Sequence, residues 1–132
     1  MATLVDIGTY LDTQLASLTL GTNLFLGRLP DSPDKCVALL EYGGSTPIST
    51  LGSDAMPRME MPRIQVLSRD VAYSDARALA ISVWQVIEGI LNETLTGTLY
   101  QRVSAVQSAF PLERDSVQRV VFAQNFQVFK EL

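Results

Sequence analysis

Few residues in this sequence could do acid–base or nucleophilic chemistry. The chain has no histidine, which removes the commonest general base near neutral pH, the usual zinc ligand, and both Ser-His-Asp and Cys-His arrangements. A Ser-Lys dyad would need Lys35 or Lys130, which the pattern places in a turn and at the chain end. The single cysteine, Cys36, precedes a strand-like run. We therefore expect it to be a buried small hydrophobe, without a partner for a disulfide.

Carboxylates and glycines offer only weak signals for a site. The acidic pairs Asp31/Asp34 and Glu113/Asp115 lie in predicted loops, where solvated turn formers are far more common than weak calcium ligands. A glycosidase would need two carboxylates about 5 to 9.5 Å apart, and nothing in the sequence selects such a pair. The run Gly43–Thr46, GGST, lacks the G-x-x-x-x-G-K-[ST] pattern of a phosphate loop. We therefore expect no enzyme, no metal and no cofactor.

Arg58, Arg63 and Arg69 are spaced along one region. They could form a solvated sheet face, or they could dock against an acidic protein surface. The sequence alone leaves both readings open.

The composition points to a subunit with partners. The chain has 132 residues, of which 47% are apolar and only 18% charged, whereas about a quarter charged is usual. One domain covering residues 1–132 fits this length. The net charge of −4 disfavours loose binding to nucleic acid. We find no signal peptide, and no stretch approaches the roughly 18 apolar residues of a membrane span.

The longest helical period runs from Ser74 to Leu91 and predicts the helix that closes the core. Its apolar face, with Trp84 at the border, comprises Ala76, Leu79, Ala80, Val83, Val86, Ile87, Ile90 and Leu91. A face this wide needs a flat apolar partner, for which a β-sheet is suited. Ile81 projects from the polar flank between Arg77 and Glu88. It is either a stray surface residue or a subunit contact.

A first helix and six strands are expected around this helix. The helix spans Thr3–Leu18, with a leucine-rich stripe on one side and Asp6 among the residues that face away. The strands are residues 23–29, 36–42, 59–69, a short run before the Leu95–Leu99 turn, 99–108 and 117–129. The order α-β-β-β-α-β-β-β predicts an α+β domain with a mixed or mainly antiparallel sheet packed by two helices.

The alternation of side chains assigns faces to these strands. Ile64 and Val66 point one way, and Arg63 and Gln65 the other. In the strand from residue 99, Val103 is expected opposite Tyr100 and Arg102. The last strand sets Val120, Phe122, Phe126 and Val128 against Val121, Ala123, Asn125 and Gln127.

Two connections stand out as candidates for contact. Gly43–Pro57 contains three glycines and two prolines, which predicts no regular structure. Phe110–Ser116 is the second connecting loop. A loop as long as Gly43–Pro57 in a compact domain is usually functional or disordered.

Several blocks of the sequence resemble a known family. The most specific are Leu20–Pro30, LGTNLFLGRLP, with Asp31 after it, and Arg63–Val66, RIQV, followed by Arg69-Asp70, Tyr73 and Ala76-Arg77. The chain is similar to the phage minor capsid protein family, the small α+β tail-completion or tail-terminator proteins of long-tailed bacteriophages. The similarity runs from about Leu4 to Lys130. These blocks are structural signatures and carry no active site.

The resemblance implies a virion protein, assembled in the host cytoplasm, that forms a ring, commonly six-fold, at the head-proximal end of the tail tube. Its partners would be other copies, the tail-tube protein and the head–tail connector or an adaptor. DNA would pass through the lumen without specific binding. The alternatives are another neck component, such as a head-completion or connector-adaptor protein, and a small-ligand-binding regulatory domain with a pocket between sheet and helix.

Three regions are expected to make the contacts. Gly43–Pro57 would meet the tube or a neighbour, Phe110–Ser116 the axial partner, and the flank of the second helix the adjacent subunit. The candidate residues are Gly43, Gly44, Ser45, Thr46, Leu51, Met56, Arg58, Arg77, Ile81, Glu88, Glu113, Arg114 and Asp115.

Overall fold

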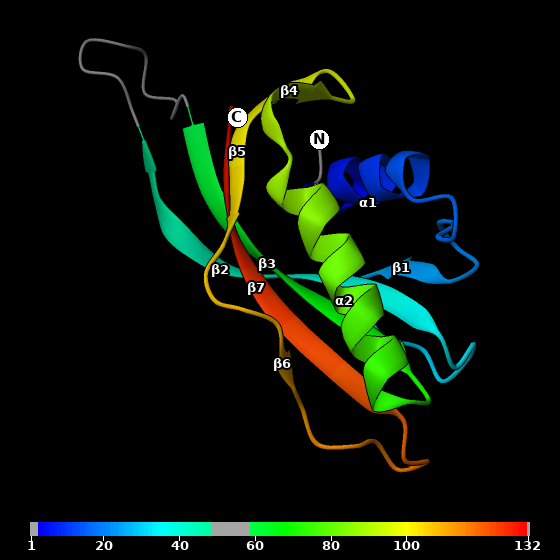
Figure 1. The fold of residues 1–132 in the computed structure, drawn as a ribbon. Coiled ribbons are helices and arrows are strands. Elements are labelled where there is room, and N and C mark those ends of the chain that lie inside the picture. The colour runs from blue at the N-terminus through cyan, green and yellow to red at the C-terminus, as the bar shows by residue number, and fades with distance from the viewer. Residues whose placement is uncertain (1–2, 49–58, 132) are drawn as a thin grey trace, which may run out of the picture.

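The computed structural model describes residues 3–48 and 59–131, with the side chains of residues 46–48 left out (Figure 1). Its elements are α1 (Thr3–Gln14), β1 (Leu24–Leu26), β2 (Cys36–Ile48), β3 (Met59–Asp70), α2 (Tyr73–Glu88), β4 (Leu91–Leu95), β5 (Thr98–Ala105), β6 (Phe110–Pro111) and β7 (Val120–Glu131). The predicted α+β class with two helices is confirmed. The described residues contain one strand more than predicted, because β6 lies inside the segment expected to be a loop.

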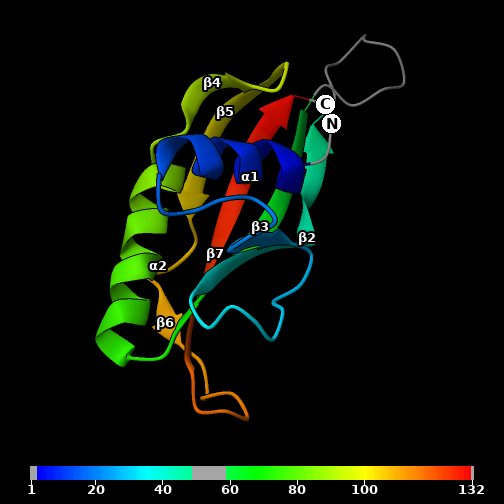
Figure 2. The same cartoon turned by 90° about the vertical axis from the view of Figure 1, so that its right-hand side faces the viewer.

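The strands form one mixed, strongly curled sheet. Its order is β1-β2-β3-β7-β5-β4, with β6 paired to β7. Only β1 with β2 is parallel among these ladders, and the other pairs are antiparallel. Both helices lie on one face of the sheet (Figures 1 and 2). The opposite face is not covered by a helix of the described chain.

The α2 helix packs on this sheet as its period predicts. Its buried residues Ala76, Leu79, Ala80, Val83 and Ile87 form the inner face. Leu79, Val83 and Ile87 share the main core with Ile64, Val66, Phe126 and Val128. Ala76 and Ala80 pack with Val120 and Phe122 in a second cluster. The helix ends earlier than predicted, at Glu88. The Gly89 amide donates to the Val86 carbonyl at 3.2 Å and the Ile90 amide to the Ile87 carbonyl at 3.1 Å, which tightens the last turn. Leu91 consequently opens β4 and is 62% exposed, not part of the core.

The α1 helix also ends early, at Gln14 instead of Leu18. Beyond Gln14 the side chain of Asn23 bonds two backbone groups that would otherwise take part in helical hydrogen bonds. Its Oδ1 accepts from the Thr19 amide at 2.6 Å, and its Nδ2 donates to the Ser17 carbonyl at 2.8 Å. Ile7 and Leu11 are buried as predicted. Asp6, expected to face water, is only 1% exposed.

Asp6 is buried because a tyrosine from the far end of the chain reaches it. The Tyr100 hydroxyl donates to Asp6 Oδ2 at 2.6 Å. Tyr100 was predicted opposite Val103, yet both are buried. A register shift in the β5–β7 ladder between Tyr100 and Arg102 inserts one residue and turns Tyr100 to the core side.

The β2 strand continues through the glycines that were predicted to end it. Gly43 and Gly44 have φ of 38° and 156°, and the ladder with β3 shifts register between Tyr42 and Gly44. The glycines therefore bend the strand as a bulge, and pairing resumes through Ser45 to Ile48. The prediction of irregular structure is wrong for residues 43–48, and residues 49–58 lie outside the described part.

Other strand boundaries differ by a few residues. Gly27, with φ of 90°, follows the three-residue strand β1. β7 begins at Val120 and not at Val117, which is 64% exposed, because the Asp115 side chain holds the preceding residues in a turn. The predicted alternation of β7 holds around Phe126. Neither described helix is long and apolar enough to cross a membrane.

Candidate functional site

The two residues described next, Cys36 and Lys130, are both buried, and Lys130 is paired with Glu60. Cys36 is fully buried, and burial raises the pKa of its thiol despite the opposing charges of Arg69 and Arg119. Lys130 is 2% exposed, lies 3.0 Å from Glu60 Oε1 and sits 5.6 Å above the ring of Tyr100. No cluster of three or more Cys, Asp or Glu side chains suited to a metal occurs among residues 3–48 and 59–131.

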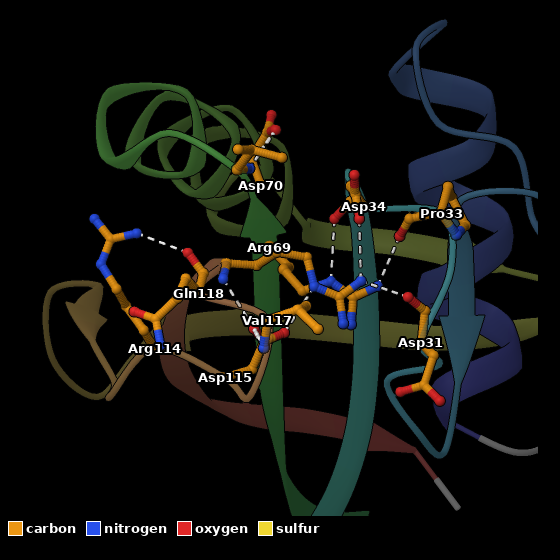
Figure 3. A network of polar contacts seen from close by, with 11 residues as sticks. Asp31, Pro33, Asp34, Arg69, Asp70, Arg114, Asp115, Val117 and Gln118 are labelled. Atoms are coloured by element: carbon orange, nitrogen blue, oxygen red, sulfur yellow. Dashed lines mark hydrogen bonds and ion pairs between the residues drawn. The ribbon is translucent and has the colours of Figure 1, made fainter.

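A buried arginine, Arg119, joins two loops through contacts with Asp115, Asp34 and Asp31, which are labelled in Figure 3. Its Nε lies 2.7 Å from Asp115 Oδ2, and its Nη1 lies 3.2 Å from Asp34 Oδ1 and donates to the Asp31 carbonyl. Only 9% of the Arg119 side chain is exposed. The guanidinium therefore fastens the 31–34 turn to the loop that precedes β7.

Arg69 completes this network from β3. Its Nη2 donates to the Pro33 carbonyl at 2.6 Å and its Nε to the Asp34 carbonyl at 3.0 Å (Figure 3). It is 2% exposed, so neither reading of the arginine series, a solvated face or a docking surface, applies to it. Arg63 is half-buried and donates to Gln127 Oε1 at 2.9 Å. Arg58 lies outside the described residues.

The loop before β7 is held in one shape by its own side chains. Asp115 Oδ1 accepts from the amides of Val117 and Arg119. Burial raises the pKa of Asp115, but the hydrogen bonds from Arg119 more than offset this, so its pKa lies below the ordinary value. Arg114 donates to the Gln118 carbonyl at 2.8 Å. Glu113 is exposed. Of the three candidates in this loop, Asp115 is thus a structural support, while Glu113 faces solvent.

The outward flank of α2 carries a shallow apolar hollow of about 420 Å³. It is lined by Ile81, Trp84, Gln85 and Glu88. Ile81 is half-buried in this hollow. Glu88 Oε1 accepts from Trp84 Nε1 at 3.1 Å and from the Ala105 amide at 2.8 Å. Arg77 is exposed one turn before Ile81.

The glycine bulge of β2 is clamped by Gln127. Gln127 Nε2 donates to the carbonyls of Met61 at 2.9 Å and Pro62 at 3.2 Å, opposite the bulge. Ser45 Oγ lies 3.4 Å from Gln127 Oε1. Gly43 and Gly44 are exposed. Of the other candidates in this region, Thr46 lies in β2, and Leu51 and Met56 lie outside the described residues.

A second hollow was not predicted from the sequence. It measures about 160 Å³ and lies between α1 and the β4–β5 turn, lined by Asp6, Thr9, Tyr10, Thr13, Thr94, Leu95 and Thr96. Burial and the nearby Glu93 carboxylate raise the pKa of Tyr10. The two walls of this hollow, residues 6–13 and 94–96, are distant in the chain. No local sequence pattern therefore predicts the hollow. Arg119 was missed for the same reason, although its place four residues after Asp115 was a usable signal.

The fold defines a class of small α+β protein, a curled mixed sheet with two helices packed on one face. The chain belongs to the bacteriophage tail terminator protein family, whose model matches residues 10–131. It is therefore a structural protein of the phage tail and a component of the virion, which confirms the family resemblance.

A solved structure has the same fold. It is a chain of the "Virion of native gene transfer agent (GTA) particle", with a TM-score of 0.72 and 15% sequence identity. The alignment covers 99% of this chain and 96% of that one. At this identity the likeness concerns the fold alone. No curated protein matches the sequence.

Proposed function

We propose that this protein forms a ring, commonly six-fold in the family it resembles, at the head-proximal end of the tail tube. There it stops polymerisation of the tube and joins the tail to the head connector. It acts as a structural component without catalysis. The chain as a whole covers residues 1–132 as one tail-terminator-like domain.

The observation that carries this proposal is the rigid end built by the two buried arginines. Arg119 ties the 31–34 turn to the 112–119 loop, and Arg69 ties the same turn to β3. A surface whose loops are fixed before binding loses less conformational entropy on docking. This end carries the exposed carboxylates of Asp31, Asp34 and Glu113, and it suits a partner placed along the tail axis.

Three surfaces divide the contacts. The 112–119 loop, with Glu113 and Arg114, meets the axial partner. The α2 flank, with Arg77, Ile81 and Glu88, meets the neighbouring subunit. The bent β2 strand from Gly43 onward, with Leu51, Met56 and Arg58 beyond it in sequence, meets the tube. DNA passes the acidic ring without specific binding, because a net charge of −4 per subunit repels phosphate.

Purified tail-tube protein provides the test. Tubes polymerised with this protein should stop growing and carry a ring at one end in electron micrographs. Tubes that lengthen to the same extent with and without the protein would overturn the terminator role. Binding to the connector alone, with no binding to tubes, would instead identify the other neck component considered above.

A variant of the 112–119 loop distinguishes binding to the connector from termination of the tube. Glu113→Lys reverses an exposed charge on the axial surface and should weaken connector binding while tubes are still terminated. Gln101→Lys, at an exposed position of β5, is the matched control and should leave both activities unchanged. Equal connector binding by the Glu113→Lys variant and the control would remove this loop from the axial surface.

A further inference from the structure

We propose that the outward flank of α2 in one copy docks against the helix-free face of the sheet in the next copy. This inference rests on the proposed ring and names the two surfaces that build it. The occupant of the α2 hollow is then an apolar side chain of a second copy.

The helix-free face is defined by the strand register. Residues on that face align in cross-strand rows, and the rows are Leu91–Arg102–Phe129, Ser104–Gln127–Arg63–Tyr42, Asn125–Gln65–Leu40, Phe110–Ala123–Leu67–Ala38–Phe25 and Val121–Arg69–Cys36. Their partners on the other side of the sheet, such as Ile64 and Val66, belong to the core under the helices. The two faces therefore point in opposite directions (Figure 1).

The middle of this face is apolar and incompletely covered. Leu40, Leu67 and Phe129 are half-buried there. Tyr42 is 38% exposed and Leu91 is 62% exposed. A partner that covers these side chains gains about 25 cal/mol for each Å² of apolar surface removed from water.

The polar side chains among them are bonded to one another. Gln65 Nε2 donates to Asn125 Oδ1 at 3.0 Å, and Arg63 Nε donates to Gln127 Oε1 at 2.9 Å. Groups already paired in this way lose fewer hydrogen bonds to water when a partner covers them. The face can therefore be buried at a lower desolvation cost than its composition suggests.

The α2 flank offers the complementary shape and charge. Its hollow beside Ile81 and Trp84 is mostly apolar, and Glu88 lies at its edge. The five rows contain three arginines, of which Arg63 and Arg69 are engaged with Gln127 and with carbonyls. The row beyond them, Met59–Glu131, adds one carboxylate to the face. Arg102 is exposed and can face Glu88 of the next copy, while Tyr42 enters the hollow.

Nucleic acid fits this face poorly. Arg69 is buried and bonded to carbonyls, and Arg63 is engaged with Gln127. Phosphate binding needs several available cations, and Arg102 is the exposed arginine of the rows. A protein surface with an apolar centre is the better match.

The placement of the two patches on opposite faces decides the symmetry. A patch that pairs with a different patch on the next copy is heterologous, and repetition gives a closed ring or a filament instead of a two-fold dimer. A stable interface covers about 800 Å² on each partner. Two such patches would take almost a quarter of the 7027 Å² surface, which accounts for the low charged content.

Face-specific variants test this pairing. Ile81→Asp places a charge in the hollow, and Tyr42→Asp places one on the sheet face. Each variant alone should run as a monomer in analytical ultracentrifugation at concentrations where the wild-type chain forms rings. Val71→Asp introduces the same charge at an apolar residue that is 55% exposed and lies outside both patches, and it should still form rings.

An equimolar mixture of the two variants gives the decisive result. The Ile81→Asp chain keeps its sheet face and the Tyr42→Asp chain keeps its α2 flank, so one intact interface remains between them. The mixture should form a heterodimer and nothing larger. Ring formation by either variant alone, or a mixture that stays monomeric, would overturn the pairing.

Folding and the ring itself are checked separately. Far-UV circular dichroism and thermal unfolding should match the wild-type chain. If Ile81→Asp unfolds, Gln85→Trp fills the hollow from an exposed position and must likewise prevent rings. If the wild-type chain forms no ring either alone or at tube ends, the proposed ring and this interface are both overturned. If the variants still form intact rings, only the interface is overturned.

Discussion

The Tyr100 hydroxyl donates a 2.6 Å hydrogen bond to Asp6 Oδ2, and this bond joins β5 to α1 inside the core. Tyr100 is fully buried and Asp6 is 1% exposed. Asp6 Oδ1 has no hydrogen-bond partner among the described residues. The phenol is thus the main support of a buried carboxylate, and the attachment of α1 depends on it.

Tyr100→Phe should destabilise the fold by about 2 kcal/mol, because a buried carboxylate would lose the partner of its Oδ2. Urea unfolding followed by circular dichroism measures the change. Tyr73→Phe is the matched control: Tyr73 is 51% exposed and its ring packs edge-on against Phe122, so loss of its hydroxyl should cost less than about 0.5 kcal/mol. Equal effects of the two substitutions would contradict the role given to the bond.

The same bond predicts an alkaline loss of stability. Burial, followed by the hydrogen bond and charge of Asp6, raises the pKa of Tyr100 above its ordinary value of 10.0. Below pH 10 both folded and unfolded chains hold the proton, and the contribution is complete. Above pH 10 the unfolded chain releases it first, so the free energy of unfolding falls by up to about 1.4 kcal/mol per pH unit. Urea titrations from pH 9 to 11 should show a steeper fall for wild type than for Tyr100→Phe.

Arg69→Met should cost about 2 kcal/mol, because the carbonyls of Pro33 and Asp34 lose a charged donor. Chemical denaturation measures the loss. Arg28→Met, at an exposed position, is the control for the changed charge and should have little effect. An unchanged midpoint for the Arg69 variant would mean that water replaces the guanidinium without cost.

Asp115 predicts that the loop before β7 loosens in acid. The hydrogen bonds from Arg119 keep the pKa of Asp115 below its ordinary value of 3.8, so its contribution is present above pH 3.8 and is lost as the pH falls through the lower folded value. Hydrogen exchange of the Val117 and Arg119 amides should accelerate, relative to core amides, as this carboxylate is protonated. In Asp115→Asn the extra acceleration should be absent. Parallel behaviour of loop and core amides would refute the prediction.

Gly44→Ala should destabilise the chain by about 2 kcal/mol or more, because a Cβ would lie 2.8 Å from the Met61 carbonyl oxygen. Gly97→Ala is the control, since Gly97 has a φ of +83° and no atom within 4 Å of the added Cβ. Backbone strain alone should then cost about 1 kcal/mol. Thermal unfolding compares the two variants, and a larger loss at Gly97 would contradict the close packing at the bulge.

Local pattern in the sequence determined most of the elements. The periods of α2 and β7 placed Val83, Phe122 and Phe126 on inner faces, because one buried stripe or alternate row must repeat with the geometry of the element. Cys36 was rightly expected to be buried, since it begins an apolar run. The family resemblance was also carried by the sequence, through blocks such as Leu20–Pro30.

Tertiary structure decided where these patterns break. Gly43 and Gly44 carry a turn signal, yet pairing with β3 and the Gln127 clamp keep them in a strand. Alternation predicted Tyr100 on the face opposite Val103, but a single inserted residue in β5 turned it to the same side, toward Asp6. Neither outcome is visible locally, because each depends on a partner supplied by a distant strand.

For the proposed contact surfaces too, some properties followed from the sequence and others only from the fold. The sequence determined that the chain lacks histidine, is poor in charge and places Ile81 off the core face of its helix. Only the fold brought Arg119 to Asp34, gathered Ile81 with Trp84 in a hollow, and set that hollow on the side opposite Tyr42. The physical reason is that composition and period are properties of a segment, whereas a surface is made by segments that meet only when the sheet curls.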